Sequence, residues 1–319
     1  MNLRFQYAGL ITAACLLAVG APSLALAQPK APEKAAKQNP TDYAPGLRAM
    51  DLNNHVMVGK GSGLPDPRPQ DWRTPDPDNL LVIDTNKGRI VVELAPAIAP
   101  ISVERIKTLA RQHFYDGQTF FRVIDNFMDQ TGDPKNSGEG GSPLPNIKGE
   151  FTFRRGPNPA FVPVTESGSP HSGFFGTVPI ATEPDALMDM TADGKVPAWG
   201  EFCSGVVGMA RAGDPDSANS QFYVMRHDYP KLNKQYAVFG RVVDGLEVAR
   251  AIKVGEPPDD PQDRMITVRL ASDLPAAQRP VVGVLDANSP AFKARVEQAR
   301  IEKGDDFTLC SVDIPVKPH

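Results

Sequence analysis

Hydrophobic and polar residues alternate most clearly in the segment 119–133, which reads TFFRVIDNFMDQTGD. Residues 121–124 are aromatic or β-branched apart from one arginine, a composition that favours a buried strand. Residues 125–126 indicate a turn, and a second strand is predicted from residue 127, with Met128 and Gln130 on one face and Phe127 and Asp129 on the other. The guanidinium of Arg122 is costly to bury among apolar neighbours unless it reaches a partner or a cleft. Arg122 is therefore either a structural arginine paired with a carboxylate or a functional residue.

The apolar pattern before this segment predicts a hairpin and then a helix. Two strands, 80–83 and 89–94, flank the Asn-Lys-Gly sequence at 86–88, which is typical of a tight turn. Residues 101–111 carry apolar residues at helical spacing, and Pro100 is tolerated in the first turn of a helix. We therefore expect a hairpin followed by a helix with one apolar face.

Further strands are predicted in the second half of the chain. Residues 206–213 (VVGMARAG) predict a strand that ends in small residues, and residues 220–223 (SQFY) begin another. Residues 238–243 predict a strand, residues 245–253 a second helix, and residues 265–270 a last strand.

Beyond these strands, residues 275–319 form a C-terminal extension. It contains a predicted strand at 281–284, a helix at 290–303 and an apolar segment at 307–312. A segment of about 40 residues is usually too small to form a stable domain on its own. We expect it to pack on the rest of the chain, beside the N-terminal arm.

The first 27 residues have the pattern of a secretory signal, with Arg4 at the start, an apolar run at 9–19 and Ala-Leu-Ala before Gln28. We expect export to a bacterial periplasm and cleavage near Ala27/Gln28, which leaves no stable membrane span. An uncleaved anchor and a lipid attached to a cysteine are the alternatives. Residues 28–79 are rich in proline and predict a tether and an extended arm, anchored by a tryptophan or disordered.

Composition adds mainly exclusions. The net charge is −4, whereas a nucleic-acid-binding protein usually carries an excess of positive charge. Nucleic acid is therefore not an expected partner. The five histidines are scattered, so neither a metal nor a cofactor is expected. Signal cleavage would remove Cys15 and leave Cys203 and Cys310, which could form a disulfide in an oxidising compartment. The alternative is that Cys203 is a small buried residue before a core strand.

Four short motifs occur in a fixed order along the chain. The pattern F-[HF]-R-[VI]-I-x-x-F-M-x-Q-x-G-D matches residues 120–133, M-A-x-A-G matches 209–213, S-Q-F-[FY] matches 220–223, and V-F-G-x-V-x-x-G matches 238–245. In this order they resemble the cyclophilins, a family of peptidyl-prolyl cis/trans isomerases. The resemblance covers about residues 80–274. It implies a mainly β domain, a closed eight-stranded antiparallel β-barrel with two capping helices.

The chain departs from the cyclophilin pattern between residues 142 and 200, where prolines, glycines and polar residues are frequent. We predict a long loop insertion at about 154–197, folded over the barrel. It either extends the substrate groove or is a loop without a function in binding.

The resemblance implies that Arg122 is the catalytic residue. An X-Pro bond rotates slowly because amide resonance raises a barrier of about 18–20 kcal/mol. A fixed cation that hydrogen-bonds the prolyl nitrogen only in the twisted state lowers that barrier, and arginine keeps its charge at working pH.

The resemblance also implies three groups of substrate-binding residues. The walls of the proline pocket would be Phe127, Met128, Tyr223 and Leu232. The peptide backbone would be held by Gln130 and Gln221. The groove for the preceding residue would be lined by Ala210, Arg211 and Ala212, with Phe121 beside Arg122 and with Tyr236 closing the far side.

At three positions this sequence carries a residue that differs from the one found in many members of the family. Phe121 stands where many have histidine, so that polar contact is absent. Arg211 replaces a common asparagine and would favour acidic or polar residues before the proline. Lys231 stands where some members carry a tryptophan that contacts the cyclic peptide cyclosporin. We therefore expect weak inhibition by cyclosporin, and a titration that gave submicromolar inhibition would contradict this.

The sequence thus predicts a monomeric periplasmic isomerase that acts on proline-containing peptides and unfolded exported proteins. The alternative is a proline-peptide-binding or chaperone module of the cell envelope with little turnover.

Overall fold

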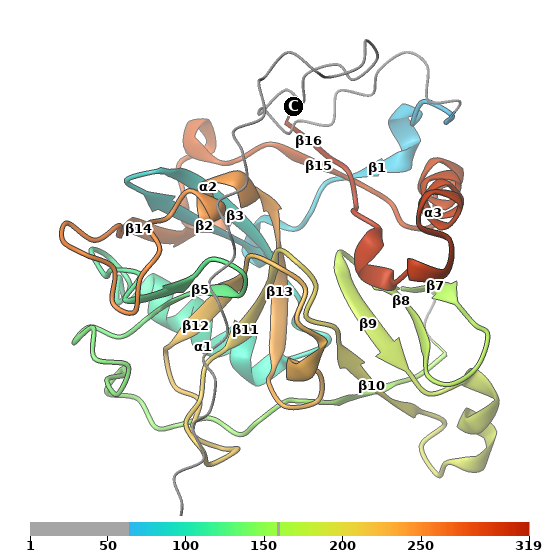
Figure 1. The fold of residues 1–319 in the computed structure, drawn as a ribbon, viewed down its shortest axis with the longest axis horizontal. Coiled ribbons are helices and arrows are strands. Elements are labelled where there is room, and N and C mark those ends of the chain that lie inside the picture. The colour runs from blue at the N-terminus through green and yellow to red at the C-terminus, as the bar shows by residue number, and fades with distance from the viewer. Residues whose placement is uncertain (1–63, 158–159, 319) are drawn as a thin grey trace, which may run out of the picture. The chain divides into compact units, whose positions relative to one another are not determined.

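We analysed a computed structural model, which describes residues 64–157 and 160–318 (Figure 1). The predicted signal segment and most of the predicted tether lie outside these residues. In the described ranges no helix is long and apolar enough to cross a bilayer.

The central element is an eight-stranded antiparallel sheet with the strand order β14-β2-β3-β13-β11-β12-β5-β4. Along the chain its strands are β2 (Leu80–Thr85), β3 (Gly88–Leu94), β4 (Arg122–Ile124), β5 (Met128–Thr131), β11 (Val206–Met209), β12 (Phe222–Met225), β13 (Val238–Asp244) and β14 (Met265–Leu270). The two edge strands approach each other through isolated bridges, Thr119 with Arg264 and Val123 with Gly255. The described strands show no continuous ladder between β4 and β14, but backbone hydrogen bonds from Gly117 to Met265, from Met265 to Gln118 and from Phe120 to Asp263 also join the two edges. The sheet is therefore curled, and its two edges meet over a short stretch before β4 and at the start of β14.

Two helices accompany the sheet. α1 (Pro100–Arg111) begins where the carboxylate of Glu150 accepts hydrogen bonds from the backbone N–H groups of Ile101 and Ser102, at 2.9 and 2.7 Å. This carboxylate satisfies N–H groups that have no partner within the helix. The apolar face of α1 packs into the interior core of the sheet. α2 (Leu246–Arg250) is shorter than the predicted helix at 245–253.

Alternate residues of the same strands lie in different cores, as the two-residue period of a strand requires. In β2, Leu81 and Ile83 belong to the interior core, whereas Leu80 and Val82 belong to a second core outside the sheet. That second core is covered by the C-terminal extension, whose helix α3 (Pro290–Lys303) contributes the fully buried Phe292.

The extension also forms a small sheet with the arm. β1 (Trp72–Arg73) pairs with β15 (Val282–Leu285), which pairs with β16 (Val316–Pro318). Short 3-10 helices complete the described chain: Pro69–Asp71, Pro77–Asn79, Asp185–Met190, Pro230–Leu232, Ala271–Asp273, Ala276–Gln278, Gly304–Asp306 and Leu309–Ser311.

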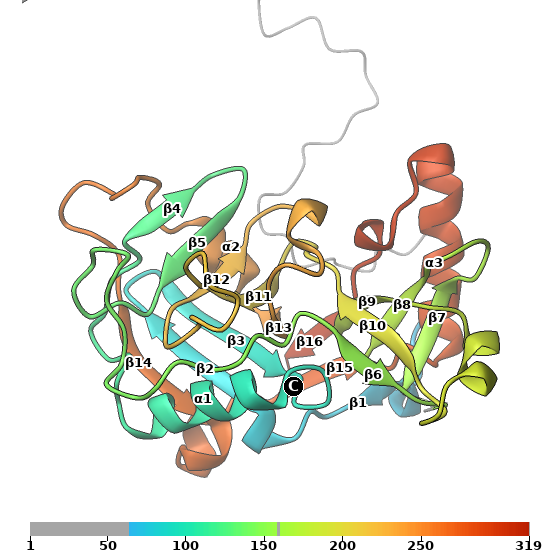
Figure 2. The ribbon, with the colours of Figure 1, turned by 90° about the horizontal axis from the view of Figure 1, so that it is seen from below.

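The insertion is not a loop, and this part of the sequence prediction was wrong. It forms a five-stranded antiparallel sheet with the order β6-β10-β9-β8-β7 (Figure 2). The strands are β6 (Phe153–Arg155), β7 (Phe161–Thr165), β8 (His171–Phe175), β9 (Val178–Thr182) and β10 (Val196–Gly200). All five residues of β9 are buried, and Val178 and Ile180 belong to the same hydrophobic cluster as Met128 and Tyr223. The five-stranded sheet is therefore packed against the central sheet despite its prolines and glycines.

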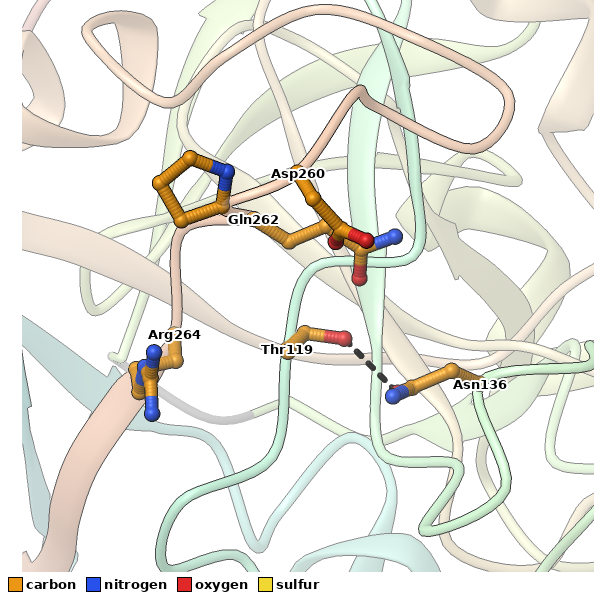
Figure 3. A pocket seen from close by; sticks show the side chains of 6 residues that line it. Thr119, Asn136, Asp260, Gln262 and Arg264 are labelled. Carbon is orange, nitrogen blue, oxygen red and sulfur yellow. Dashed lines mark hydrogen bonds between the residues drawn. The ribbon is translucent and has the colours of Figure 1, made fainter.

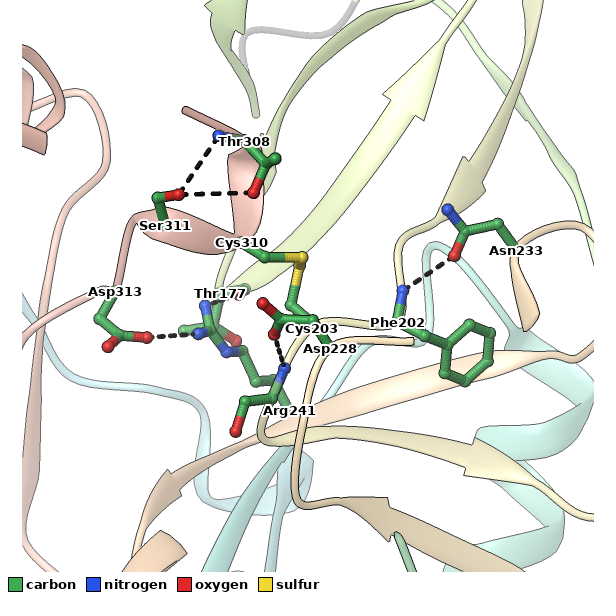
Figure 4. Close-up of a disulfide and its surroundings, with 11 residues drawn as sticks. Thr177, Phe202, Cys203, Asp228, Asn233, Arg241, Thr308, Cys310, Ser311 and Asp313 are labelled. Atoms are coloured by element: carbon green, nitrogen blue, oxygen red, sulfur yellow. Dashed lines mark hydrogen bonds and ion pairs between the residues drawn. A yellow bond between two sulfur atoms is a disulfide. The ribbon is translucent and has the colours of Figure 1, made fainter. Parts of the chain in front are cut away.

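A disulfide joins Cys203, just before β11, to Cys310 in the C-terminal extension (Figure 4). Cys203 is buried and Cys310 is half-buried on the 3-10 turn Leu309–Ser311. Nearby, Arg241 of β13 donates a 2.9 Å hydrogen bond to Asp313 of the extension. The extension is therefore tied to the central sheet both covalently and by an ion pair.

Candidate active site

The register of four neighbouring strands puts three of the predicted site residues, Arg122, Gln130 and Tyr223, in one row. Arg122 of β4 lies opposite Gln130 of β5, Gln130 lies opposite Tyr223 of β12, and Tyr223 lies opposite Gly208 of β11. Residues directly opposite each other in an antiparallel sheet project from the same face. The intervening residues, such as Val123 and Phe222, belong to the interior core. The row therefore projects from the face of the sheet opposite to that core.

A chain of side-chain hydrogen bonds runs along this face. The Nε2 of Gln130 donates to the Oε1 of Gln221 at 2.9 Å. The Nε2 of Gln221 donates to the backbone oxygens of Gly138 and Gly140, at 2.9 and 2.8 Å. Both N–H groups of Gln221 are therefore engaged, while Gln130 keeps one for another acceptor.

The guanidinium of Arg122 is held at two of its nitrogens. Its Nη1 donates to the Oε1 of Gln130 at 3.2 Å, and its Nε donates to the Oε2 of Glu256 at 2.8 Å. Its Cζ lies 6.0 Å from the ring centre of Phe127. Among the described residues, the Nη2 group has no hydrogen-bond partner. Because 38% of the Arg122 side chain is exposed, this nitrogen remains available to a ligand.

Apolar residues next to Arg122 gather in one cluster. Met128 and Tyr223 are buried, and the partly buried Phe127, Leu232 and Tyr236 pack against the same core. The rings of Tyr223 and Tyr236 meet edge to face at 6.1 Å, and Phe127 lies 4.6 Å from Tyr229. The structure thus brings the predicted walls of the proline pocket together.

The hydroxyl of Tyr223 is buried and has no hydrogen-bond partner in the described part of the chain. Burial raises the pKa of this hydroxyl well above its usual value. A Cβ on Gly208 would lie 2.8 Å from both the Cζ and the hydroxyl oxygen of Tyr223. Gly208 therefore leaves the space that the tyrosine ring occupies.

The predicted groove for the preceding residue lies at the other end of the cluster. Ala210 donates its N–H to the backbone oxygen of Gln221 at 2.9 Å. The guanidinium of Arg211 lies over the rings of Tyr236 and Phe151, 4.6 and 5.2 Å from their centres. It donates to the backbone oxygens of Gln235 and Ala212 at 3.0 and 2.8 Å. Arg211 is therefore fixed beside the pocket, and Ala212 is exposed next to it.

Phe121 is buried and lies against Gly138, so it offers the groove no polar atom. Gly138 belongs to a glycine-rich turn, residues 138–141. This turn is held by Asp133, a residue that was not predicted to belong to the site. One carboxylate oxygen of Asp133 accepts from the N–H groups of Ser137 and Gly138, at 2.9 and 2.7 Å. Burial acts to raise the pKa of Asp133, but hydrogen bonds from the backbone N–H groups of Lys135, Gly140 and Ser137 and from the Ser137 hydroxyl outweigh it, and the pKa is lowered.

Sequence analysis also missed Glu256. It is separated from Arg122 by 134 residues, and no local pattern connects the two. A pocket of about 550 Å³ lies beside the same loop and is lined by Thr119, Asn136, Asp260, Pro261, Gln262 and Arg264 (Figure 3). Its lining does not include Arg122, so it is adjacent to the row of site residues and not part of it.

One group of potential metal ligands occurs among the described residues. The carboxylate of Glu201 and the sulfurs of Cys203 and Cys310 lie within 4.8 Å of one another. The two sulfurs are joined in the disulfide and are not free to bind an ion. Burial raises the pKa of Glu201.

Comparison with known proteins agrees with this geometry. The family described as cyclophilin type peptidyl-prolyl cis-trans isomerase/CLD matches residues 80–272. A probable peptidyl-prolyl cis-trans isomerase of Brucella suis biovar 1 (strain 1330) is 34% identical over 191 residues, 56% of this chain and 74% of the relative. A putative peptidyl-prolyl cis-trans isomerase of Staphylococcus aureus (strain USA300) is 32% identical over 195 residues, 58% of this chain and 84% of the relative.

Among solved structures, the cyclophilin AquaCyp293 from Hirschia baltica superposes with a TM-score of 0.71 at 36% identity, covering 77% of this chain and 92% of that one. The curled antiparallel sheet and the row on its outer face define a cyclophilin fold. This chain belongs to the cyclophilin-type peptidyl-prolyl cis-trans isomerase family, and it is an isomerase enzyme.

Proposed function

We propose that this enzyme accelerates rotation about X-Pro bonds in exported proteins, and that Arg122 stabilises the twisted amide. The observation that carries the proposal is the Arg122 guanidinium, which is held by Gln130 and Glu256 beside an apolar cluster and keeps Nη2 free. No bond is made or broken in this reaction, so it needs neither a nucleophile nor a redox group.

The chemistry requires a donor that acts in the twisted state. When the X-Pro bond rotates, amide resonance is lost and the prolyl nitrogen gains a lone pair. An N–H of Arg122 donates to that lone pair, which is unavailable in the planar ground state, so the bond favours only the transition state. The apolar cluster of Phe127, Met128 and Tyr223 holds the proline ring.

The magnitude shows that Arg122 does not act alone. To accelerate a rotation of about 0.01 per second by about 10⁵, the enzyme must lower the barrier by about 7 kcal/mol. A hydrogen bond from a charged group contributes about 1.5–3 kcal/mol. Preferential binding of the twisted form in the pocket supplies the rest.

The two glutamines divide their roles in this proposal. Gln221 uses both N–H groups on the glycine turn and accepts from Gln130, so it orients Gln130 and does not bind the peptide directly. Gln130 orients Arg122 and keeps one N–H, which is available to a peptide carbonyl. This narrows our expectation from sequence, which gave both residues to the peptide backbone.

Export to a periplasm is part of the proposal and rests on the signal pattern in residues 1–27. The disulfide between Cys203 and Cys310 supports it, because disulfides persist in oxidising compartments. The substrates would then be unfolded exported proteins and peptides that contain proline, and the enzyme would act as a monomer.

The test is cis-to-trans isomerisation of an Ala-Pro peptide by the chain that begins at Gln28. We expect acceleration by the wild type and a loss of about 100-fold or more in kcat/KM for Arg122→Ala. Arg89→Ala is the matched control, since Arg89 is an arginine that pairs with Asp84 on the distant β2–β3 hairpin. A folded wild type that gives no acceleration would favour a proline-binding module with little turnover.

A further inference from the structure

We propose that Glu256 is a positioning residue for Arg122, and that the loop 255–264 fixes the guanidinium in the orientation that catalysis needs. This inference rests on the proposed role of Arg122. It assigns a function to an acidic, proline-rich loop that otherwise resembles solvated surface.

The loop is joined to the edge of the sheet next to Arg122. Gly255 and Val123 exchange two backbone hydrogen bonds, 2.8 Å from the N–H of Val123 and 2.9 Å from the N–H of Gly255. At the other end of the loop, Thr119 bridges Arg264. Because Glu256 follows Gly255 and Arg122 precedes Val123, this antiparallel pairing places the two side chains beside each other.

The loop is anchored independently of Glu256. The carboxylate of Asp263 accepts from the side-chain amide of Asn86 at 2.6 Å and from the N–H of Lys253 at 2.8 Å. The ammonium of Lys253 donates to the backbone oxygen of Asp259 at 2.8 Å. Removal of the Glu256 side chain should therefore leave the loop in place.

Two contacts are needed to fix a planar group at the end of a flexible side chain. With Gln130 alone, the guanidinium would have one neutral acceptor at 3.2 Å and could rotate about it. Glu256 adds a charged acceptor at 2.8 Å on a different nitrogen, Nε, and leaves Nη2 free. Catalytic groups must be held within about 0.5 Å of the productive geometry, so this second contact affects the transition state more than substrate binding.

Two other roles for Glu256 predict different results. An exposed ion pair can be without consequence, and 52% of the Glu256 side chain is exposed. A carboxylate beside the catalytic cation could also weaken its charge, in which case its removal would raise the rate. The choice of variants separates these roles, because glutamine keeps the acceptor oxygen and loses the charge.

The experiment measures kcat and KM with an Ala-Pro peptide for the wild type, Glu256→Ala, Glu256→Gln, Asp259→Ala and Arg122→Ala. We expect Glu256→Ala to lose about tenfold in kcat with KM nearly unchanged, and Glu256→Gln to stay within about threefold of the wild type. Asp259→Ala is the matched control, because it removes an acidic side chain from the same loop and should stay within about twofold. The Nε–H signal of Arg122 in ¹⁵N-correlated NMR spectra should be protected from exchange in the wild type and in Glu256→Gln, and lost in Glu256→Ala.

The inference is overturned if Glu256→Ala matches or exceeds the wild type in kcat. It is also overturned if Glu256→Gln is as slow as Glu256→Ala, or if Asp259→Ala is equally slow, because charge and not the hydrogen bond would then be responsible. Arg122→Ala separates a failure of the proposed role of Arg122 from a failure of the proposed role of Glu256. If it keeps full activity, the proposed role of Arg122 fails and the inference fails with it; if it is inactive while Glu256→Ala is normal, only the inference fails.

Discussion

Loss of the disulfide should destabilise the protein strongly, and Cys310→Ala is the cleanest way to remove it. Cys310 is the more exposed partner and lies on a short 3-10 turn of the C-terminal extension, whereas Cys203 is 2% exposed within a hydrophobic cluster. Replacing Cys310 therefore breaks the bond with little loss of core packing. The extension keeps its other contacts, including the ion pair between Arg241 and Asp313.

The size of the effect follows from the length of chain that the bond closes. Cys203 and Cys310 are separated by 107 positions, and a closed loop of about 100 residues restricts the unfolded chain by about 4.7 kcal/mol in the chain-entropy treatment. Removal of native disulfides typically costs about 2–5 kcal/mol. We expect the free energy of unfolding to fall by about 3–5 kcal/mol, which lowers Tm by about 10 °C in a domain of this size.

Guanidinium and thermal unfolding of the chain that begins at Gln28 would test this, with the wild type measured before and after treatment with a reductant. Ser311→Ala changes the residue next to Cys310 on the same turn and should shift the free energy of unfolding by less than about 1 kcal/mol. The reasoning is refuted if Cys310→Ala is as stable as the oxidised wild type. It is equally refuted if thiol titration of the untreated, unfolded protein finds two free cysteines.

Three further predictions concern single side chains. Burial raises the pKa of Asp129 from 3.8 to about 7, against the opposing effect of Arg226, so the native state binds its proton more tightly than the unfolded state. The stability that Asp129 contributes should then fall as pH rises from about 4 to about 7, by up to about 4 kcal/mol, and this slope should be absent in Asp129→Asn when unfolding is measured against pH. It should be smaller in Asp125→Asn, because the charge of Asp125 helps to raise the pKa of Asp129. Tyr223→Phe removes a buried hydroxyl without a partner and should raise the free energy of unfolding by about 1 kcal/mol in denaturant titrations; a destabilised variant would show that the hydroxyl is satisfied. Arg211 should make Glu-Pro peptides better substrates than Lys-Pro peptides by about fivefold in kcat/KM, and Arg211→Ala should remove this preference; equal rates for both peptides with the wild type would contradict it.

The central sheet was predictable because its strands follow simple periodicity. The pattern in residues 127–130 assigned Met128 and Gln130 to one face, and the register confirms that both lie on the face of Arg122. The motif that contains Arg122 and Gln130 also contains the turn between them, so their proximity is encoded within a few residues. The predicted helix at 290–303 matches α3. Its start could be predicted because Ser289 caps the helix and Pro290 occupies its first turn.

The insertion was not predictable because its strands violate the usual local signals. Pro163 lies within β7 and Gly173 within β8, and both residues normally argue against a strand. β9 is buried along its whole length and shows no alternation. Phe174 packs against Phe292 of the distant helix α3, at 5.4 Å between ring centres. Tertiary contacts of this kind outweigh local propensity.

The two hydrogen-bond partners of Arg122, Gln130 and Glu256, are held in place in different ways. Gln130 is held in place by the register of β4, β5 and β12, and that register is fixed by the interior core, since Val123 and Phe222 of the same strands face inwards. A slip of one residue would exchange the two faces, so any change that keeps the core intact also keeps Gln130 beside Arg122. Glu256 depends instead on a loop outside the sheet, anchored by Asp263. The ends of this loop bridge Val123 and Thr119 at the edge of the sheet. We therefore expect substitutions of the exposed Glu256 side chain, which leave these bridges in place, to change the activity of this enzyme more than its stability.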